Sequence, residues 1–143
     1  MPRPQSNRIV YEPPLFCEFK PIGVRGQDLK QIVLTLDEFE AFRLADQLGL
    51  SHAIAADEME ISRSTFSRLV AKARKKIADF IIQGRLLTIG GGSVHFRFNI
   101  IQCQDCNHMF RMNLSQAITE CPSCNSNKII NLAGSFGHGK CCI

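Results

Sequence analysis

The sequence lacks the features that mark several large classes of protein. No stretch approaches the roughly 18 consecutive apolar residues of a membrane-spanning helix. The N-terminal charges are not followed by an apolar segment, which argues against a secretory signal. With 45% apolar and 21% charged residues, the composition excludes wholesale disorder, a collagen-like chain and a coiled-coil rod. We therefore expect a cytoplasmic protein whose 143 residues form one domain of ordinary size or two small ones.

Signals for catalysis are also missing. No glycine-rich phosphate-binding motif precedes a helical pattern, and no nucleophile stands in an evident arrangement with a base. Too little chain remains for a catalytic domain once the two modules described below are assigned. The sequence thus predicts a protein that is not an enzyme.

The chain divides by pattern into four segments. Residues 1–34 hold five of the six prolines and are expected to form an extended arm, with a short strand near residues 32–34. Residues 35–85 have the apolar spacing of helices, whereas residues 86–133 alternate and contain two cysteine pairs. Residues 134–143, rich in glycine and cysteine, are typical of a flexible tail. The predicted fold is a mainly α helix-turn-helix domain of three helices, followed by a small β domain that resembles a zinc ribbon.

The three helices are predicted from their ends. Thr35 and Glu38 form a capping box, in which each side chain satisfies a free amide of the other residue. Ser51 and Ser62 are N-cap residues for a second and a third helix, and glycines at positions 49 and 84 stop the first and the third. The predicted helices, at residues 35–48, 51–59 and 62–83, are joined by very short turns. This spacing is typical of a helix-turn-helix.

Charge is concentrated in opposite signs on the two parts of the helical segment. Residues 35–61 contain seven acids and one base, and residues 62–77 contain six bases and no acid. A run of charge is most often a solvated face, but the third predicted helix also has an apolar stripe. Its members are Phe66, Leu69, Val70, Ala73, Ile77, Phe80 and Ile81. If this stripe packs on the first two helices, the basic face is left exposed.

An exposed basic helix of this kind suits the major groove of DNA. The arginines can each donate two hydrogen bonds to guanine, the hydroxyl groups can contact bases or backbone, and the lysines can meet phosphates. The candidate DNA-binding residues are Arg63, Ser64, Thr65, Ser67, Arg68, Lys72 and Lys75. The alternative is a structural three-helix domain with a solvated basic face.

The run LTLDEFEAFRLADQLGLSHAIAADEMEISRSTFSRLVAKARKKI resembles the helix-turn-helix of bacterial sigma factor region four. The arm MPRP…FKPIG, the LTLDE start, the SRSTF turn, ARKKIADF and the following GGG resemble uncharacterised protein family 0251, over about the first 90 residues. That family consists of predicted DNA-binding proteins, so the resemblance implies a DNA-binding role. Glu60 departs from such motifs, because this turn position is usually a glycine with positive φ.

Four cysteines have the spacing of a metal site. Cys103, Cys106, Cys121 and Cys124 form two C-x2-C pairs, and two such pairs complete the tetrahedral all-thiolate site that zinc prefers. Alternating apolar residues at positions 94, 96, 98 and 100 predict a strand before the first pair, and residues 128–132 predict another after the second. A domain of under 50 residues builds little core, so the zinc would supply folding energy.

Other chemistry for the cysteines is less favoured. Iron in a rubredoxin-like site has the same four ligands, a redox dithiol needs only one pair, and disulfides conflict with a cytoplasmic protein. His108 follows a cysteine pair and is a spare candidate ligand. Cys17 is expected to be a small buried hydrophobe. Cys141 and Cys142, with His138, could form a second metal or redox site, although an inert tail is the simpler interpretation.

We therefore expect a sequence-specific protein that binds double-stranded DNA, a transcriptional regulator with a structural zinc site. One alternative is a module that contacts the transcription machinery, for which the acidic first two helices would suit a basic partner. Another is a metal- or redox-responsive regulator. A homodimer is a further expectation because most helix-turn-helix proteins bind as dimers, although no heptad pattern identifies a dimer face. No membrane partner is expected.

Overall fold

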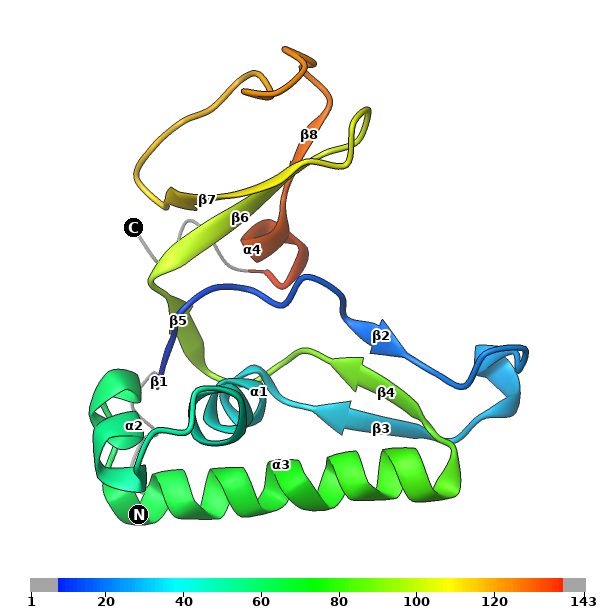
Figure 1. Ribbon diagram of the computed structural model, residues 1–143, viewed down its shortest axis with the longest axis vertical. Coiled ribbons are helices and arrows are strands. Elements are labelled where there is room, and N and C mark those ends of the chain that lie inside the picture. Colours follow the sequence, from blue (N-terminus) through cyan, green and yellow to red (C-terminus); the bar gives the residue numbers. More distant parts are fainter. Residues whose placement is uncertain (1–7, 138–143) are drawn as a thin grey trace. The chain divides into compact units, whose positions relative to one another are not determined.

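The computed structural model describes residues 8–137 and has a mixed α/β fold (Figure 1). In chain order the elements are β1 (Arg8–Val10), β2 (Glu18–Phe19), the 3-10 helix η1 (Gly26–Asp28), β3 (Gln31–Leu34), α1 (Leu36–Phe42), the π-helical segment η2 (Arg43–Gln47), α2 (His52–Met59), α3 (Arg63–Gln83), β4 (Leu86–Ile89), β5 (Val94–Phe96), β6 (Phe98–Cys103), β7 (Met109–Asn113), β8 (Ile129–Asn131) and α4 (Leu132–Ser135). Within residues 8–137, no helix combines the length and apolar character that crossing a bilayer requires.

The chain forms two compact units. The first comprises residues up to Ile9 together with Phe16–Val94, and the second comprises Val10–Leu15 and the chain from His95 onward. The expected arm of residues 1–34 is therefore not a separate segment, since its described part is shared between the two units. In the first unit, the Arg8 amide donates to the carbonyl of Ser93 at 3.1 Å. In the second, the Arg97 amide donates to the carbonyl of Val10 at 2.9 Å.

The helices of the first unit begin and end where their local signals indicate. Thr35 and Glu38 make both hydrogen bonds of a capping box, and the hydroxyls of Ser51 and Ser62 accept from amides three residues further on. Gly84 ends α3 in the left-handed conformation, at φ 65°. The first helix differs from its prediction, because the segment predicted to continue it to residue 48 changes to π-helical geometry at Arg43.

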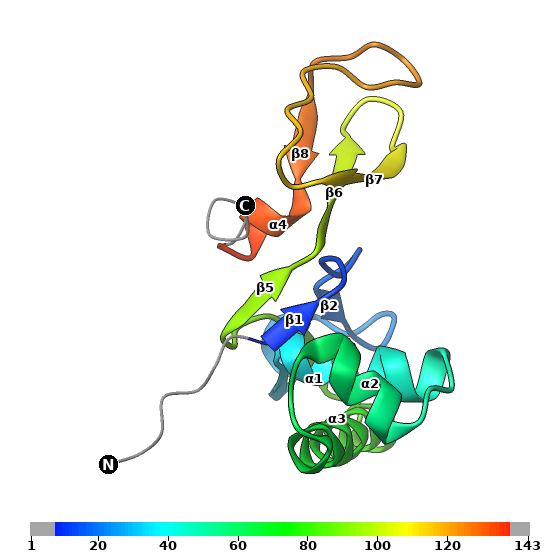
Figure 2. The same ribbon diagram turned by 90° about the vertical axis from the view of Figure 1, so that its left-hand side faces the viewer.

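A small apolar core joins the three helices, and Figure 2 shows α1 and α2 beside α3. The buried residues of this core are Ala41, Leu44, Ala55, Ala56, Met59, Phe66, Leu69 and Val70. The second half of the predicted stripe on α3 does not belong to this core. Ile77 and Phe80 are only half-buried and Ile81 is 69% exposed, because α3 continues past the other helices and lies along β3 and β4 (Figure 1).

A three-stranded sheet in the order β2-β4-β3 makes the first unit mixed in class rather than mainly α. β3 was predicted near residues 32–34, and it pairs in parallel with β4, with Gln31 opposite Leu86 and Leu34 opposite Ile89. β2 pairs with the other edge of β4 in antiparallel orientation. The predicted boundary after residue 85 is consequently displaced, because β4 belongs to the sheet of the first unit and not to the cysteine-containing unit.

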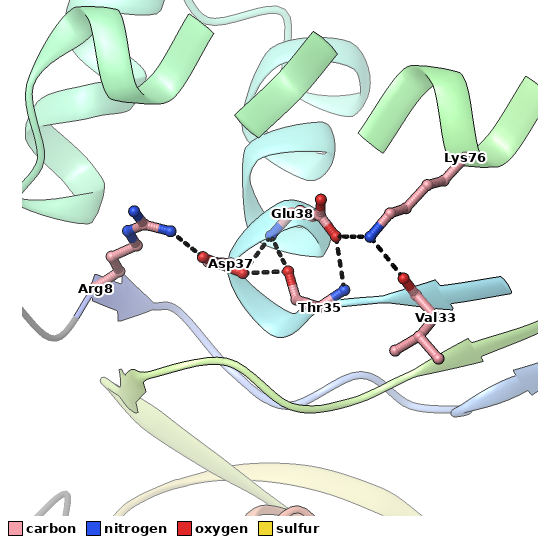
Figure 3. Close-up of polar contacts among 6 residues, drawn as sticks. All are labelled: Arg8, Val33, Thr35, Asp37, Glu38 and Lys76. Carbon is pink, nitrogen blue, oxygen red and sulfur yellow. Dashed lines mark hydrogen bonds and ion pairs between the residues drawn. The ribbon is translucent and has the colours of Figure 1, made fainter. Parts of the chain in front are cut away.

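Acidic residues at the start of α1 are buried in a polar network (Figure 3). Asp37 pairs with the guanidinium of Arg8 and accepts from the Thr35 hydroxyl. The Glu38 carboxylate accepts from the Thr35 amide at 3.0 Å and from Lys76 Nζ at 2.6 Å, and Lys76 also donates to the Val33 carbonyl at 2.7 Å. These contacts give the buried carboxylates hydrogen bonds and a neighbouring positive charge. Without them, removing the carboxylates from water would cost free energy of folding.

The GGG motif fits against this network. The Gly91 carbonyl accepts from the Leu36 amide at 3.1 Å, in the first turn of α1. Gly92 has φ 93°, and a Cβ at this position would lie 3.2 Å from an oxygen of Asp37. A side chain would thus be strained in its backbone and crowd the buried carboxylate. The motif consequently serves the packing of the first unit.

The second unit has a three-stranded antiparallel sheet in the order β7-β6-β8. β8 corresponds to the strand predicted after the second cysteine pair, whereas β7 was not predicted. The strand predicted before the first pair is broken at Arg97, and its alternation fails in β6, where Asn99 and Ile101 are buried as well as Ile100. The physical reason is α4, whose Ala133 amide donates to the Asn99 side chain at 3.0 Å and so covers the face that alternation assigns to solvent.

Candidate functional sites

The four cysteines of the two C-x2-C pairs come together in the second unit, as the sequence predicts. The sulfur atoms of Cys103, Cys106, Cys121 and Cys124 all lie within 4.8 Å of one another. Two sulfur–sulfur contacts join the two pairs, at 3.5 Å between Cys103 and Cys124 and at 3.6 Å between Cys106 and Cys121. Cys103 and Cys121 are fully buried, while the second cysteine of each pair is exposed.

Each cysteine pair is shaped by the same backbone hydrogen bonds. The amide of the first cysteine donates to the carbonyl five residues later, from Cys103 to His108 at 2.9 Å and from Cys121 to Ser126 at 2.8 Å. That cysteine's carbonyl accepts from Asn107 in the first pair, at 3.0 Å, and from Asn125 in the second, at 2.8 Å. Both asparagines are left-handed, with φ 61° and 60°. Asparagine tolerates this conformation better than most residues. Each of the two cysteine turns is therefore the five-residue sequence C-x2-C-N.

The backbone of these turns favours a thiolate at Cys103. The amide of Cys106, followed by that of Asp105, lowers the pKa of Cys103 to about 7 despite burial. At Cys124 the amide of Ser126 acts in the same direction, but the Cys103 sulfur and desolvation outweigh it and raise the pKa of Cys124 to about 12. Ionisation of Cys103 thus opposes ionisation of Cys124, and the positive charge of a bound metal would offset that opposition.

The donor set fits a structural metal ion. Four sulfur donors within reach of one point match a tetrahedral all-thiolate site, for which zinc is the common occupant. His108 stacks on Phe110, with ring centroids 5.6 Å apart, and it is not a member of the cysteine cluster. Cys17 is exposed, which corrects the expectation that it is buried, because it leads into the short edge strand β2. His138, Cys141 and Cys142 lie outside the described residues.

In the first unit, α2 and α3 are joined by a short turn, residues 60–62. Glu60 ends α2 in the left-handed conformation, with φ 55° and ψ 45°, which is the geometry expected at this position of the turn. The departure from glycine therefore leaves the positive φ in place, at a cost of about 1 kcal/mol for a residue with a Cβ. Behind the turn, the Ile61 amide donates to the carbonyl of Ala56 at 3.0 Å.

The basic residues of α3 fall into two groups. Arg74 makes two hydrogen bonds to Asp46, at 2.8 and 2.9 Å, and their pairing lowers the pKa of Asp46 and raises that of Arg74. Lys75 pairs with Asp79 at 2.7 Å. Arg63, Arg68 and Lys72 are exposed and form no ion pair with the residues that the structure describes.

The three hydroxyl residues predicted to contact DNA differ from one another in their surroundings. Ser64 is exposed in the first turn of α3. Thr65 accepts a hydrogen bond from the Ser62 hydroxyl at 2.8 Å. The Ser67 hydroxyl lies 2.8 Å from Nδ1 of His52, so it is already engaged with α2.

The acidic surface expected on the first two helices is much reduced. Asp37, Glu38 and Glu40 are buried, and each pairs with a cation of the first unit. Asp46 forms an ion pair with Arg74. The change from an acidic to a basic segment along the sequence therefore reflects internal pairing as much as two opposed surfaces.

Comparison with known proteins identifies the family. A family model described as "Protein of unknown function DUF134" matches residues 1–97. A UPF0251 protein of Chloroherpeton thalassium is 43% identical over 140 residues, which cover 98% of this chain and 93% of the relative. The chain belongs to the UPF0251 family.

Other UPF0251 proteins are similar over different lengths. The relative from Chlorobaculum tepidum is 38% identical over 145 residues, covering 98% of this chain and 74% of its own. The relative from Methanococcus vannielii is 45% identical over 103 residues, covering 71% of this chain and 79% of its own. No solved structure matches the chain. The family model ends before the first of the clustered cysteines, and it covers the helices and sheet of the first unit.

Two features of this UPF0251 chain escape the sequence interpretation. The turn asparagines, Asn107 and Asn125, have a signal, because C-x2-C is followed by asparagine in both pairs. His52 is not among the residues that the sequence singles out, yet it contacts Ser67, and its ring meets that of Phe66 edge-on, at 5.3 Å between centroids. That contact joins two helices, and no local pattern reveals it.

Proposed function

We propose that the protein binds double-stranded DNA in a sequence-specific manner and regulates transcription in the cytoplasm. Its helix-turn-helix would consist of α2, the turn of residues 60–62, and α3. The observation that supports this most is the exposed face of α3. Arg63, Arg68 and Lys72 are exposed there and form no ion pair with the described residues, whereas the other cations of the helix are paired within the first unit. Unpaired cations beside an exposed hydroxyl, here that of Ser64, are what a DNA groove requires.

In this proposal, Arg63 and Arg68 read base edges and Lys72 contacts phosphate. Ser64, Thr65 and Ser67 are the neighbouring hydroxyls. Lys75 has a weaker role than the sequence alone predicts, because DNA must compete with Asp79 for its ammonium group. The protein acts as a homodimer on two half-sites, and no catalytic step is part of the proposal.

The cysteine cluster of the second unit holds a structural zinc ion. Four thiolates fill a tetrahedral shell, so no coordination position is left open for catalysis. Purified protein is expected to contain one zinc per chain, which elemental analysis measures. If the protein contained one iron per chain instead, the four ligands would stand and only the metal would change. Protein that folds with no metal at all would contradict the assignment of a structural metal site.

Selection of bound sequences from a random duplex pool is the primary test of DNA binding. On the selected site, Arg68→Ala is expected to lose about 1–3 kcal/mol and to relax the preference at one base pair. Lys72→Ala is expected to weaken all sequences about equally and to lower the salt slope by about one unit. Titrations at several salt concentrations measure both quantities.

Lys75→Ala is the matched control, because its ammonium group is already paired with Asp79. Its salt slope should change less than that of Lys72→Ala. All three side chains are exposed and none belongs to the apolar core, so thermal unfolding should be nearly unchanged. If no duplex is enriched, or if Arg68→Ala and Lys72→Ala bind as the parent does, the basic face is merely solvated. A module that contacts the transcription machinery would then be the better hypothesis.

A further inference from the structure

The contact between His52 and Ser67 joins the start of α2 to the exposed part of α3. His52 is the first residue of α2, and its Nδ1 lies 2.8 Å from the Ser67 hydroxyl. The ring also makes an edge-on contact with that of Phe66, which is fully buried in the core of the three helices. Both contacts restrain the imidazole of His52. The Ser67 hydroxyl therefore has a fixed hydrogen-bond partner on the side that faces α2.

A serine hydroxyl has a single hydrogen, so its inner partner decides what it offers outward. If Nδ1 is bare, Ser67 donates inward to the ring and can only accept from another molecule. If Nδ1 has the hydrogen, the ring donates to Ser67, and the hydroxyl hydrogen is free for an outside acceptor. Which nitrogen holds the hydrogen in a neutral imidazole depends on its hydrogen bonds.

The side of α3 on which Ser67 lies favours an outside acceptor. Ser67 follows Arg63 by four residues, so the two side chains share one side of the helix. DNA presents only acceptors along its phosphates, and mostly acceptors along the purine edges of the major groove. A hydroxyl that can only accept would be poorly matched to either surface.

We propose that His52 is a positioning residue that presents the Ser67 hydroxyl to DNA as a hydrogen-bond donor. This inference rests on the proposed DNA-binding function and adds a residue of α2 to it. The recipient is an acceptor oxygen or nitrogen of the duplex, either a phosphate oxygen or a base edge. His52 itself acts through Ser67, and its ring is held in the Nδ1–H form by the complex.

The test is a double-mutant cycle on the selected duplex, with His52→Ala, Ser67→Ala and the double variant. Each single variant is expected to bind about three- to tenfold more weakly, as for the loss of one hydrogen bond. The double variant should lose about as much as one single variant, because both remove the same contact. His52→Asn is the rescue variant, since its amide nitrogen can donate from nearly the place of Nδ1, and it should bind within about twofold of the parent.

Further readouts separate this role from a structural one. The salt slope should stay unchanged in Ser67→Ala, since no charge is removed, in contrast to Lys72→Ala. Uniform weakening on all sequences assigns the acceptor to a phosphate, and relaxed preference at one base pair assigns it to a base edge. Nitrogen-15 NMR of the complex should show the His52 ring protonated at Nδ1.

Three results would overturn the proposal: a bare Nδ1 in the complex, additive losses in the cycle, or single variants that bind as the parent does. Thermal unfolding of each free variant controls for loss of fold, and Ser67→Ala removes no core contact. The failure of this inference is distinct from that of the proposed function. If the parent selects a duplex through Arg68 and Lys72 while the His52 and Ser67 variants bind normally, only the positioning role is wrong. If the parent binds no duplex, both are wrong.

Discussion

Replacing Cys121 with serine is expected to unfold the cysteine-containing unit while the helices of the first unit stay largely folded. Cys121 is fully buried, and its sulfur lies 3.6 Å from that of Cys106. A structural zinc ion contributes about 10–16 kcal/mol of binding free energy to a small domain of this kind, far more than its core supplies. Serine replaces a thiolate with a poor zinc ligand, so most of that stabilisation is lost.

Metal content and limited proteolysis of the second unit measure this result. The variant should lose the proposed zinc ion and become cleavable within residues 103–124. Its far-ultraviolet circular dichroism should keep most of the helical signal of α1–α3. Cys17→Ser is the matched control, because Cys17 is exposed in the first unit and outside the cysteine cluster. A Cys121→Ser protein that keeps stoichiometric zinc and its protease resistance would show that the cluster is not a four-thiolate metal site.

Lys76→Met is expected to destabilise the first unit by about 2–3 kcal/mol, whereas Lys75→Met changes its stability by about 0.5 kcal/mol or less. Lys76 neutralises Glu38, whose side chain is 5% exposed, and it also bonds to the Val33 carbonyl (Figure 3). Removing one partner of a buried pair leaves the other charge uncompensated. The expected cost is toward the lower end for such pairs because the Lys76 side chain is 32% exposed.

Urea unfolding followed by helical circular dichroism compares these two neighbouring lysines directly. Lys75 and Asp79 form an exposed pair one helical turn apart, so the same substitution there removes a similar side chain without burying an unpaired charge. If the two variants prove equally stable, the burial of the Glu38 carboxylate does not depend on its ion pair with Lys76. The Thr35 amide would then be sufficient to hold its carboxylate.

Helix boundaries in this protein are predictable because their signals are local. The hydroxyls of Thr35, Ser51 and Ser62 satisfy amides only three residues away, and Gly84 supplies the left-handed residue that ends α3. The sheet is less predictable, since β2 and β4 are short and gain their stability from partners distant in sequence. The π-helical geometry of Arg43–Gln47 has no sequence signal that we can identify.

The candidate sites likewise contain some features that local sequence predicts and others that depend on how the helices pack. The spacing of the four cysteines is enough to predict that they meet, because each pair is a local turn. The pairing of Lys75 with Asp79 is also visible in the sequence, as a helical contact four residues apart. The bonds of Arg74 to Asp46 and of Ser67 to His52 depend on how helices pack, so the choice of free cations and hydroxyls on α3 required the structure.

The parallel pairing of β3 with β4 bears on the order in which the protein folds during synthesis. The two strands are more than 50 residues apart, and the three helices lie between them. On the ribosome, β2 and β3 emerge first and have no partner until residues 86–89 follow. The helices can collapse on their own local core, but the sheet closes last, at the entropic cost of a long loop. A nascent chain that pauses before β4 leaves the apolar side of β3 uncovered, and an unpaired strand of this kind exposes the chain to aggregation until β4 emerges.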